Sequence, residues 1–103
     1  MDVLMIYVPC PTQTVAMQIV KTLLESRLAG CGNIYPSKSM YQWQGKMETE
    51  DEWVVVIKTL PECYTIAVEK ITNLHPYEVP AILDWKVGVN PAYYDWLKAQ
   101  IAL

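Results

Sequence analysis

The chain has 103 residues, a formal net charge of −3 and a hydrophobic fraction of 52%. This length is typical of one domain, so we expect residues 1–103 to form a single domain with a substantial core. The excess of eleven acidic over eight basic residues argues against a nucleic-acid partner, which would require a clustered positive surface.

The first element is a short apolar run from Val3 to Val8, which is typical of a strand buried on both faces. The run has no basic leader and is too short for a signal peptide or a membrane span, so no membrane association is predicted. The three cysteines are odd in number and widely spaced, which argues against a disulfide framework. Together these features predict a cytoplasmic protein.

A helix is predicted next, after the capping hydroxyls of Thr12 and Thr14. Its apolar residues recur at the helical spacing i, i+3, i+4 and i+7, namely Ala16, Ile19, Val20 and Leu23. Gly30 stands where a left-handed C-terminal cap is expected.

A long β-hairpin is predicted from the change to a two-residue period between Cys31 and Lys58. Its turn is expected near Gln44–Lys46, and each arm has about a dozen residues or more, whereas strands usually have roughly 5–6. Alternation places Tyr41 and Trp43 on one face of the first arm.

The remaining elements are a helix, a strand and a final helix. Pro61 begins the second helix, which must end near His75 because proline follows it. A strand is predicted over Ala81–Val87, and Asn90-Pro91 is typical of the start of a helix. The resulting order predicts an α+β, ferredoxin-like split βαβ fold with a long hairpin and an extra C-terminal helix.

The outer half of the hairpin carries large apolar side chains that a four-stranded sheet with two helices cannot cover. These side chains are Tyr41, Trp43, Met47 and Trp53. An aromatic edge of this kind requires a partner, and the simplest partner is another copy of the chain in a closed symmetric oligomer. The alternative is a bent hairpin that folds back on its own monomer.

Acidic residues on the second arm form a row. Alternation puts Glu48, Glu50 and Glu52 on one face, each roughly 7 Å from the next. Their repulsion requires compensation by lysines such as Lys46, by basic residues of a second copy, or by a cation. A solvated, salt-bridged face is the other interpretation.

Several segments together resemble the divalent-cation tolerance family, CutA. They are RLAGCGNI (27–34), SMYQWQGKMETEDE (39–52), KT (58–59), HPYEVP (75–80) and NPAYYDWL (90–97). The resemblance implies a ferredoxin-like subunit in a tight homotrimer, a role in tolerance of copper and other divalent ions, and a cytoplasmic location. It implies no settled enzymatic reaction. It also implies likeness to trimeric PII-type signalling proteins, so a signalling trimer that binds a small ligand between subunits is the alternative function.

The metal site implied by the resemblance is incomplete in this chain. The glutamate that usually follows HPYEVP is Ala81 here. The candidate metal ligands that remain are His75 and Cys10, which lies two or three positions from the place where the resemblance implies a cysteine. Cys10, in a Pro-Cys-Pro sequence after a strand, is expected to be the most exposed thiol. No cofactor is obligatory, and Cu(II) or another divalent cation is the candidate ion.

His75 is the only histidine, and one histidine is not a metal site. The alternatives are a structural role at the end of a helix, metal ligation and acid–base work. No nucleophile–base pair or triad is recognisable, so an enzyme is not expected.

The resemblance also places HPYEVP beside the hairpin of a neighbouring subunit. It predicts an intersubunit cleft lined by Tyr41, Trp43, Lys46, Glu48, Glu52, His75, Tyr77 and Glu78. Aromatic walls with a few charged groups are typical of a ligand pocket, and also of a subunit interface.

Overall fold

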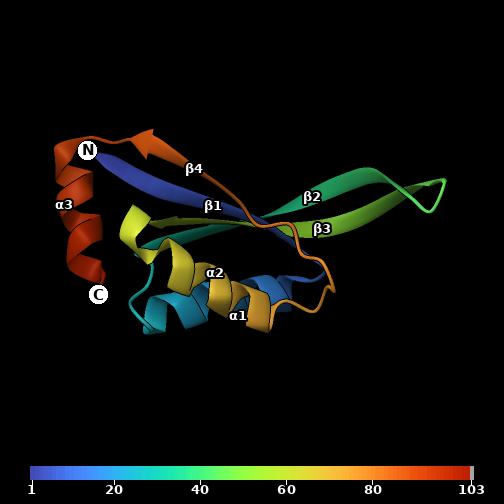
Figure 1. Cartoon of the computed structure of the whole chain (residues 1–103), viewed down its shortest axis with the longest axis horizontal. Coiled ribbons are helices and arrows are strands. Elements are labelled where there is room, and N and C mark those ends of the chain that lie inside the picture. Colours follow the sequence, from blue (N-terminus) through green and yellow to red (C-terminus); the bar gives the residue numbers. More distant parts are fainter. Residues whose placement is uncertain (103) are drawn as a thin grey trace.

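The computed structural model describes residues 1–102. Its elements follow the predicted order (Figure 1): β1 (Asp2–Cys10), α1 (Gln13–Glu25), β2 (Cys31–Trp43), β3 (Lys46–Thr59), the short 3-10 turn η1 (Pro61–Cys63), α2 (Tyr64–Leu74), β4 (Leu83–Gly88) and α3 (Pro91–Gln100). The predicted α+β class, the long hairpin and the extra C-terminal helix are therefore confirmed.

The four strands form one antiparallel sheet in the order β2-β3-β1-β4. Helices α1 and α2 cover one face, and α3 packs at the end of the sheet far from the hairpin (Figure 1). The ladder between β1 and β4 ends at the pair Tyr7–Leu83, whereas β1 stays paired with β3 as far as Cys10 and Trp53. Residues 8–10 of β1 therefore have no strand partner on the β4 side.

The main core lies between the sheet and helices α1 and α2. Alternate residues of β1 point into it, and they pack with the predicted apolar face of α1 and with β3 and α2; the fully buried side chains include Ile6, Val8, Ile19, Leu23, Val55, Ile57 and Ile71. A smaller cluster of Val3, Leu60 and Leu97 lies under α3. Burial of these side chains is the main favourable term in the folding free energy.

Helix α1 begins where the sequence predicts and ends differently. The Thr12 hydroxyl accepts a hydrogen bond from the Val15 N–H at 3.1 Å, which caps the helix. The expected left-handed cap at Gly30 is wrong, because the residue with positive φ after this helix is Arg27 (φ 56°). Gly30 is required for another reason: a Cβ there would collide with the Leu97 side chain.

The β2–β3 hairpin extends well beyond the helices (Figure 1), which gives the molecule a long axis of 46 Å against 24 and 21 Å for the other two. Its arms have 13 and 14 residues, as predicted. Gln44 and Gly45 both have positive φ, which is the backbone of a tight two-residue hairpin turn. The hairpin does not fold back on its own monomer.

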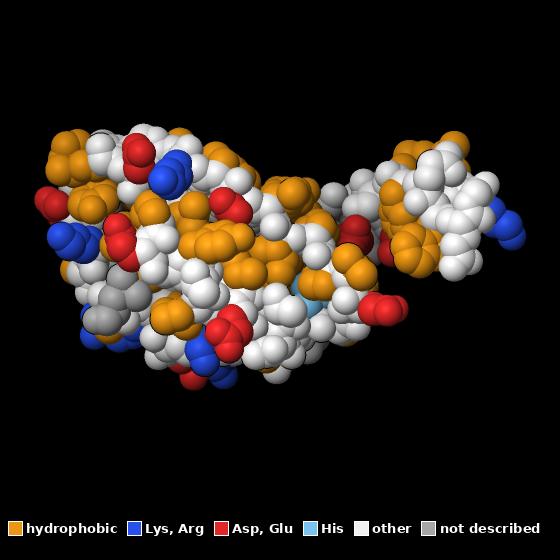
Figure 2. Space-filling model, viewed as in Figure 1, with side chains coloured by type: hydrophobic (Ala, Val, Ile, Leu, Met, Phe, Trp, Pro, Cys, Tyr) orange, Lys and Arg blue, Asp and Glu red, His pale blue; other side chains and the backbone are white. Residues whose placement is uncertain are grey.

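The sheet face opposite α1 and α2 is apolar and partly open. Helix α3 covers one end of this face, and the rest exposes the side chains of Tyr35, Leu83, Trp85 and Val87. The space-filling view shows apolar side chains on both the body and the hairpin, and a hollow where the hairpin leaves the body (Figure 2). Within residues 1–102, no helix is long and apolar enough to cross a membrane.

Candidate functional site

The segment between α2 and β4, residues 75–82, is here called the connector. It starts at His75 because Pro76 prevents the helix from continuing, and His75 has extended backbone angles (φ −79°, ψ 132°). The His75 side chain is 7% exposed, and its Nε2 lies 2.8 Å from the Pro9 carbonyl oxygen. Pro9 lies in the part of β1 that has no strand partner on the β4 side. The imidazole therefore provides the hydrogen-bond partner for a carbonyl that β4 does not reach.

The second ring nitrogen of His75 determines its tautomer. Nδ1 accepts a hydrogen bond from the Tyr77 main-chain N–H at 3.2 Å, so it carries no proton. Nε2 therefore carries the proton and donates a hydrogen bond to the Pro9 carbonyl oxygen. Because both nitrogens are engaged, coordination of a metal by His75 would require one of these hydrogen bonds to break. The ring bonds to a strand rather than to the last carbonyls of α2.

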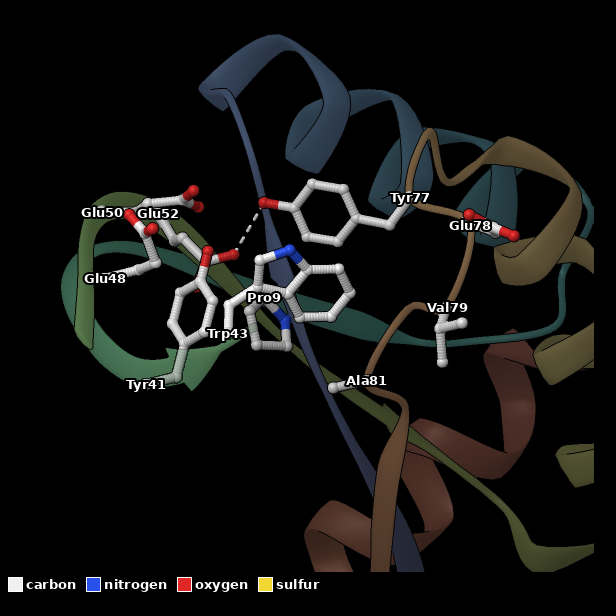
Figure 3. Close-up of a pocket in the computed structure, with 10 residues that line it drawn as sticks. All are labelled: Pro9, Tyr41, Trp43, Glu48, Glu50, Glu52, Tyr77, Glu78, Val79 and Ala81. Atoms are coloured by element: carbon white, nitrogen blue, oxygen red, sulfur yellow. Dashed lines mark hydrogen bonds between the residues drawn. The ribbon is translucent and has the colours of Figure 1, made fainter. Parts of the chain in front are cut away.

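Tyr77 joins the connector to the hairpin. Its hydroxyl donates a hydrogen bond of 2.8 Å to Oε2 of Glu52 on β3 (Figure 3), and Glu52 is only 7% exposed. Burial, this hydrogen bond and the charge of Glu52 all raise the pKa of Tyr77 well above its ordinary value of 10.0. The phenol therefore remains a donor throughout the physiological pH range.

A pocket of about 650 Å³ lies between the hairpin and the connector. It is lined by Pro9 of β1, by Tyr41, Trp43, Glu48, Glu50 and Glu52 of the hairpin, and by Tyr77, Glu78, Val79 and Ala81 of the connector (Figure 3). The three hairpin glutamates gather at one end, while Pro9, Val79 and Ala81 give an apolar surface farther along the wall.

The charged side chains that line the pocket are all carboxylates. Hydrogen bonding to Glu50, together with burial and the charges of the three hairpin glutamates, raises the pKa of Tyr41 to about 12. The pocket therefore combines aromatic walls with a negative field, which is an environment that favours a cation over an anion.

Six of the eight residues predicted for the cleft line this pocket: Tyr41, Trp43, Glu48, Glu52, Tyr77 and Glu78. The structure brings them together within one chain, whereas the prediction joined one subunit's connector to its neighbour's hairpin. Lys46 and His75 do not line the pocket. Glu50 could have been predicted from its place in the row, but Pro9 could not, because nothing local indicates what packs beside it.

The predicted exposure of Cys10 is wrong. The side chain is 0% exposed, because β1 continues through the Pro-Cys-Pro sequence and Cys10 points into the core as the partner of Trp53 on β3. Burial, with a contribution from the charge of Glu52, raises the pKa of the thiol to about 11, so a thiolate is disfavoured. Among residues 1–102, no group of three His, Cys, Asp or Glu side chains is placed to hold a metal ion.

Comparison with known proteins identifies the family. The family model described as "CutA1 divalent ion tolerance protein" matches residues 4–100. The chain belongs to the CutA1 family. It is thus a divalent-cation tolerance protein by family, as the sequence resemblance implied.

Relatives of this CutA1 chain come from archaea, bacteria and animals. It is 38% identical over 95 residues to the divalent-cation tolerance protein CutA of Pyrococcus horikoshii, covering 91% of this chain and 93% of that one. It is also 38% identical to a CutA homolog of Xenopus laevis, covering 88% of this chain but only 62% of the frog protein's length.

Solved CutA structures share the fold. The crystal structure of CutA from Xylella fastidiosa superimposes with a TM-score of 0.94 at 36% identity, covering 99% of this chain and 100% of the other. The structure of a protein named "periplasmic divalent cation tolerance protein CutA" from Archaeoglobus fulgidus also gives a TM-score of 0.94, at 31% identity, with 97% and 99% covered.

Proposed function

We propose that this CutA1 family member supports tolerance of divalent metal ions by binding a divalent cation, with Cu(II) the first candidate, at the pocket between hairpin and connector. The observation that carries this proposal is the charge of the pocket: its charged lining residues are all glutamates. Glutamates spaced roughly 7 Å apart on one face of β3 repel one another, and a divalent cation relieves that repulsion. The proposed role is binding, not catalysis.

The proposed ligands are carboxylate oxygens of Glu48 and Glu50, rather than His75 or Cys10. The His75 nitrogens already have hydrogen-bond partners, and the Cys10 thiol is buried with a raised pKa. Carboxylates bind a range of divalent ions with little selectivity, which suits a general tolerance role. Since no three donors of one chain stand together in residues 1–102, the proposed ligand set is completed by a second copy.

The proposed assembly is a homotrimer. The open sheet face exposes Tyr35, Leu83, Trp85 and Val87, and the hairpin exposes Trp43 (60%) and Met47 (66%). Strands β2 and β4 are the edges of the sheet, with unpaired main-chain groups. Apolar area of this kind beside free edges supports self-association in a closed ring.

The proposed location is the cytoplasm. Cys10, Cys31 and Cys63 are all free thiols, which suits a reducing compartment. Cell fractionation tests this location, and recovery of the protein in the periplasmic fraction would overturn it.

A calorimetric titration with Cu(II) tests the metal-binding proposal. Glu50→Gln removes one pocket carboxylate and should weaken binding about tenfold or more. Asp51→Asn is the matched control, because it makes the same charge change on the opposite face of the same strand, where Asp51 pairs with the exposed Lys38 at 3.1 Å. His75→Ala should leave the Cu(II) affinity unchanged. Absence of saturable binding, or equal loss in both carboxylate variants, would contradict the proposal.

The alternative of a signalling trimer with a small anionic ligand has weaker support. It depended on Lys46, which does not line the pocket. The lining carboxylates would repel an anion.

A further inference from the structure

Glu52 is a buried charge without a cationic partner in the described part of the chain. Its side chain lines the pocket, it is 7% exposed, and its hydrogen bond comes from the neutral phenol of Tyr77. The salt bridges within residues 1–102 are the exposed pairs Lys21–Glu25 and Lys38–Asp51. Buried carboxylates are normally paired with a positive group, so the position of Glu52 indicates a missing cation.

The pocket beside Glu52 is much larger than a metal ion needs. Its volume of about 650 Å³ lies within the usual range of roughly 300–1,000 Å³ for small-molecule sites. Much of its wall is apolar, from Trp43, Pro9, Val79 and Ala81. A bare or hydrated ion would leave this apolar wall in contact with water.

The carboxylates of Glu48, Glu50 and Glu52 lie at one end of the pocket, with the Tyr41 and Tyr77 rings beside them (Figure 3). Pro9, Val79 and Ala81 form an apolar surface farther along, with the carboxylate of Glu78 next to Val79. Aromatic rings attract ammonium groups through their negative faces, and nearby carboxylates add hydrogen-bond acceptors. A ligand that fits both ends has a positive head and an apolar body.

We propose that the pocket binds an organic ammonium ion, an amine with an aromatic or branched aliphatic body. The ammonium group donates to Glu52 and Glu50 between the Tyr41 and Tyr77 rings, and the body packs on Pro9, Val79 and Ala81. The inference rests on the proposed function only in placing a cation in the same pocket.

Calorimetry with 2-phenylethylamine, in buffer containing EDTA, tests this inference. The amine should bind saturably, and the neutral 2-phenylethanol, which has nearly the same shape, should bind at least tenfold more weakly. Glu52→Gln keeps an acceptor for the Tyr77 hydroxyl but removes the charge, and it should lower the amine affinity at least tenfold. Asp51→Asn, on the opposite face of β3, should change the affinity less than twofold.

A second variant guards against misfolding of Glu52→Gln. Val79 is 84% exposed, so Val79→Ser should leave the thermal unfolding midpoint nearly unchanged while it lowers the amine affinity at least threefold. The inference is overturned if the alcohol binds as well as the amine, if Asp51→Asn weakens binding as much as Glu52→Gln, or if no saturable binding occurs.

Parallel titration with Cu(II) without EDTA separates this inference from the metal-binding proposal. Binding of the amine but not of Cu(II) refutes only metal binding, and binding of Cu(II) but not of the amine refutes only the present inference. If both bind, each should compete with the other, since they share the carboxylates; independent binding of the two would place the amine elsewhere and overturn the inference.

Discussion

Tyr77 connects two segments that are 25 residues apart in the chain. Its hydroxyl donates to the buried carboxylate of Glu52, and hydrogen bonds to charged groups contribute about 1.5–3 kcal/mol. We therefore expect Tyr77→Phe to lower the free energy of unfolding by about 2 kcal/mol, as measured by urea titration. Tyr64→Phe is the control, because Tyr64 is exposed on α2 and its hydroxyl has no hydrogen bond within residues 1–102. An equal loss in both variants would contradict this role of Tyr77.

The raised pKa of Tyr77 predicts a loss of stability in alkali. The phenol binds its proton more tightly in the folded state than in the unfolded state, so its contribution is fully present below the ordinary pKa of 10.0. It is lost as the pH rises from about 10 through the folded-state pKa. Urea titrations of wild type and Tyr77→Phe at pH 8 to 11.5 should show a difference in unfolding free energy that shrinks above pH 10. A constant difference would show that the two states do not differ in this pKa.

Local pattern was sufficient for residues whose neighbours are close in sequence. The hairpin turn sets the register, so alternation alone predicts that Glu48 and Glu52 share a face with Tyr41. It could not predict what His75 bonds to, since Pro9 is 66 residues away and its carbonyl is available only because β4 begins at Leu83 and pairs with β1 no farther than Tyr7. The burial of Cys10 depends likewise on how far β1 continues to pair with β3.

The hairpin turn is the element whose sequence requirement is most specific. Gly45 has φ +78° with open space around it, so an alanine there meets no neighbour but must adopt a left-handed backbone. Gly45→Ala should lower the free energy of unfolding by about 1 kcal/mol. Gly88→Ala is the control, because Gly88 also faces open space and lacks a positive φ, and it should be neutral or slightly stabilising. Thermal and urea unfolding measure both variants, and an equal loss of stability in Gly45→Ala and Gly88→Ala would contradict the argument from backbone conformation.

Element boundaries were predictable where a local signal ends the element. Pro76 ends α2 and Thr12 begins α1, and both signals act within a few residues. Gly30 misled the prediction because its small size is needed for contact with Leu97 on α3, far along the chain. A glycine required by packing looks the same in sequence as a glycine required by a helix cap.

Assembly is the property of the whole molecule that the open sheet face predicts. Light scattering after size exclusion should give a mass about three times 11.8 kDa, and the unfolding temperature should rise with protein concentration. Trp85→Lys, on the open face, should shift the mass toward that of one chain. Met17→Lys is the control, because Met17 is similarly exposed but lies on the outer side of α1. A monomeric wild type would refute the proposed homotrimer.

The position of β1 has a consequence for synthesis. This strand leaves the ribosome first, yet one of its neighbours in the sheet begins at Lys46 and the other at Leu83. One edge of this apolar strand therefore waits for a partner until β3 has been made, and the other waits until the chain is nearly complete; the strand is exposed to misassociation in the meantime. We expect nascent chains arrested before Leu83 to be protease-sensitive and to recruit chaperones, which limited proteolysis of stalled ribosome complexes would detect. Strand β1 lies between β3 and β4 in the finished sheet, yet its second edge is paired only when β4, the last strand, has been made.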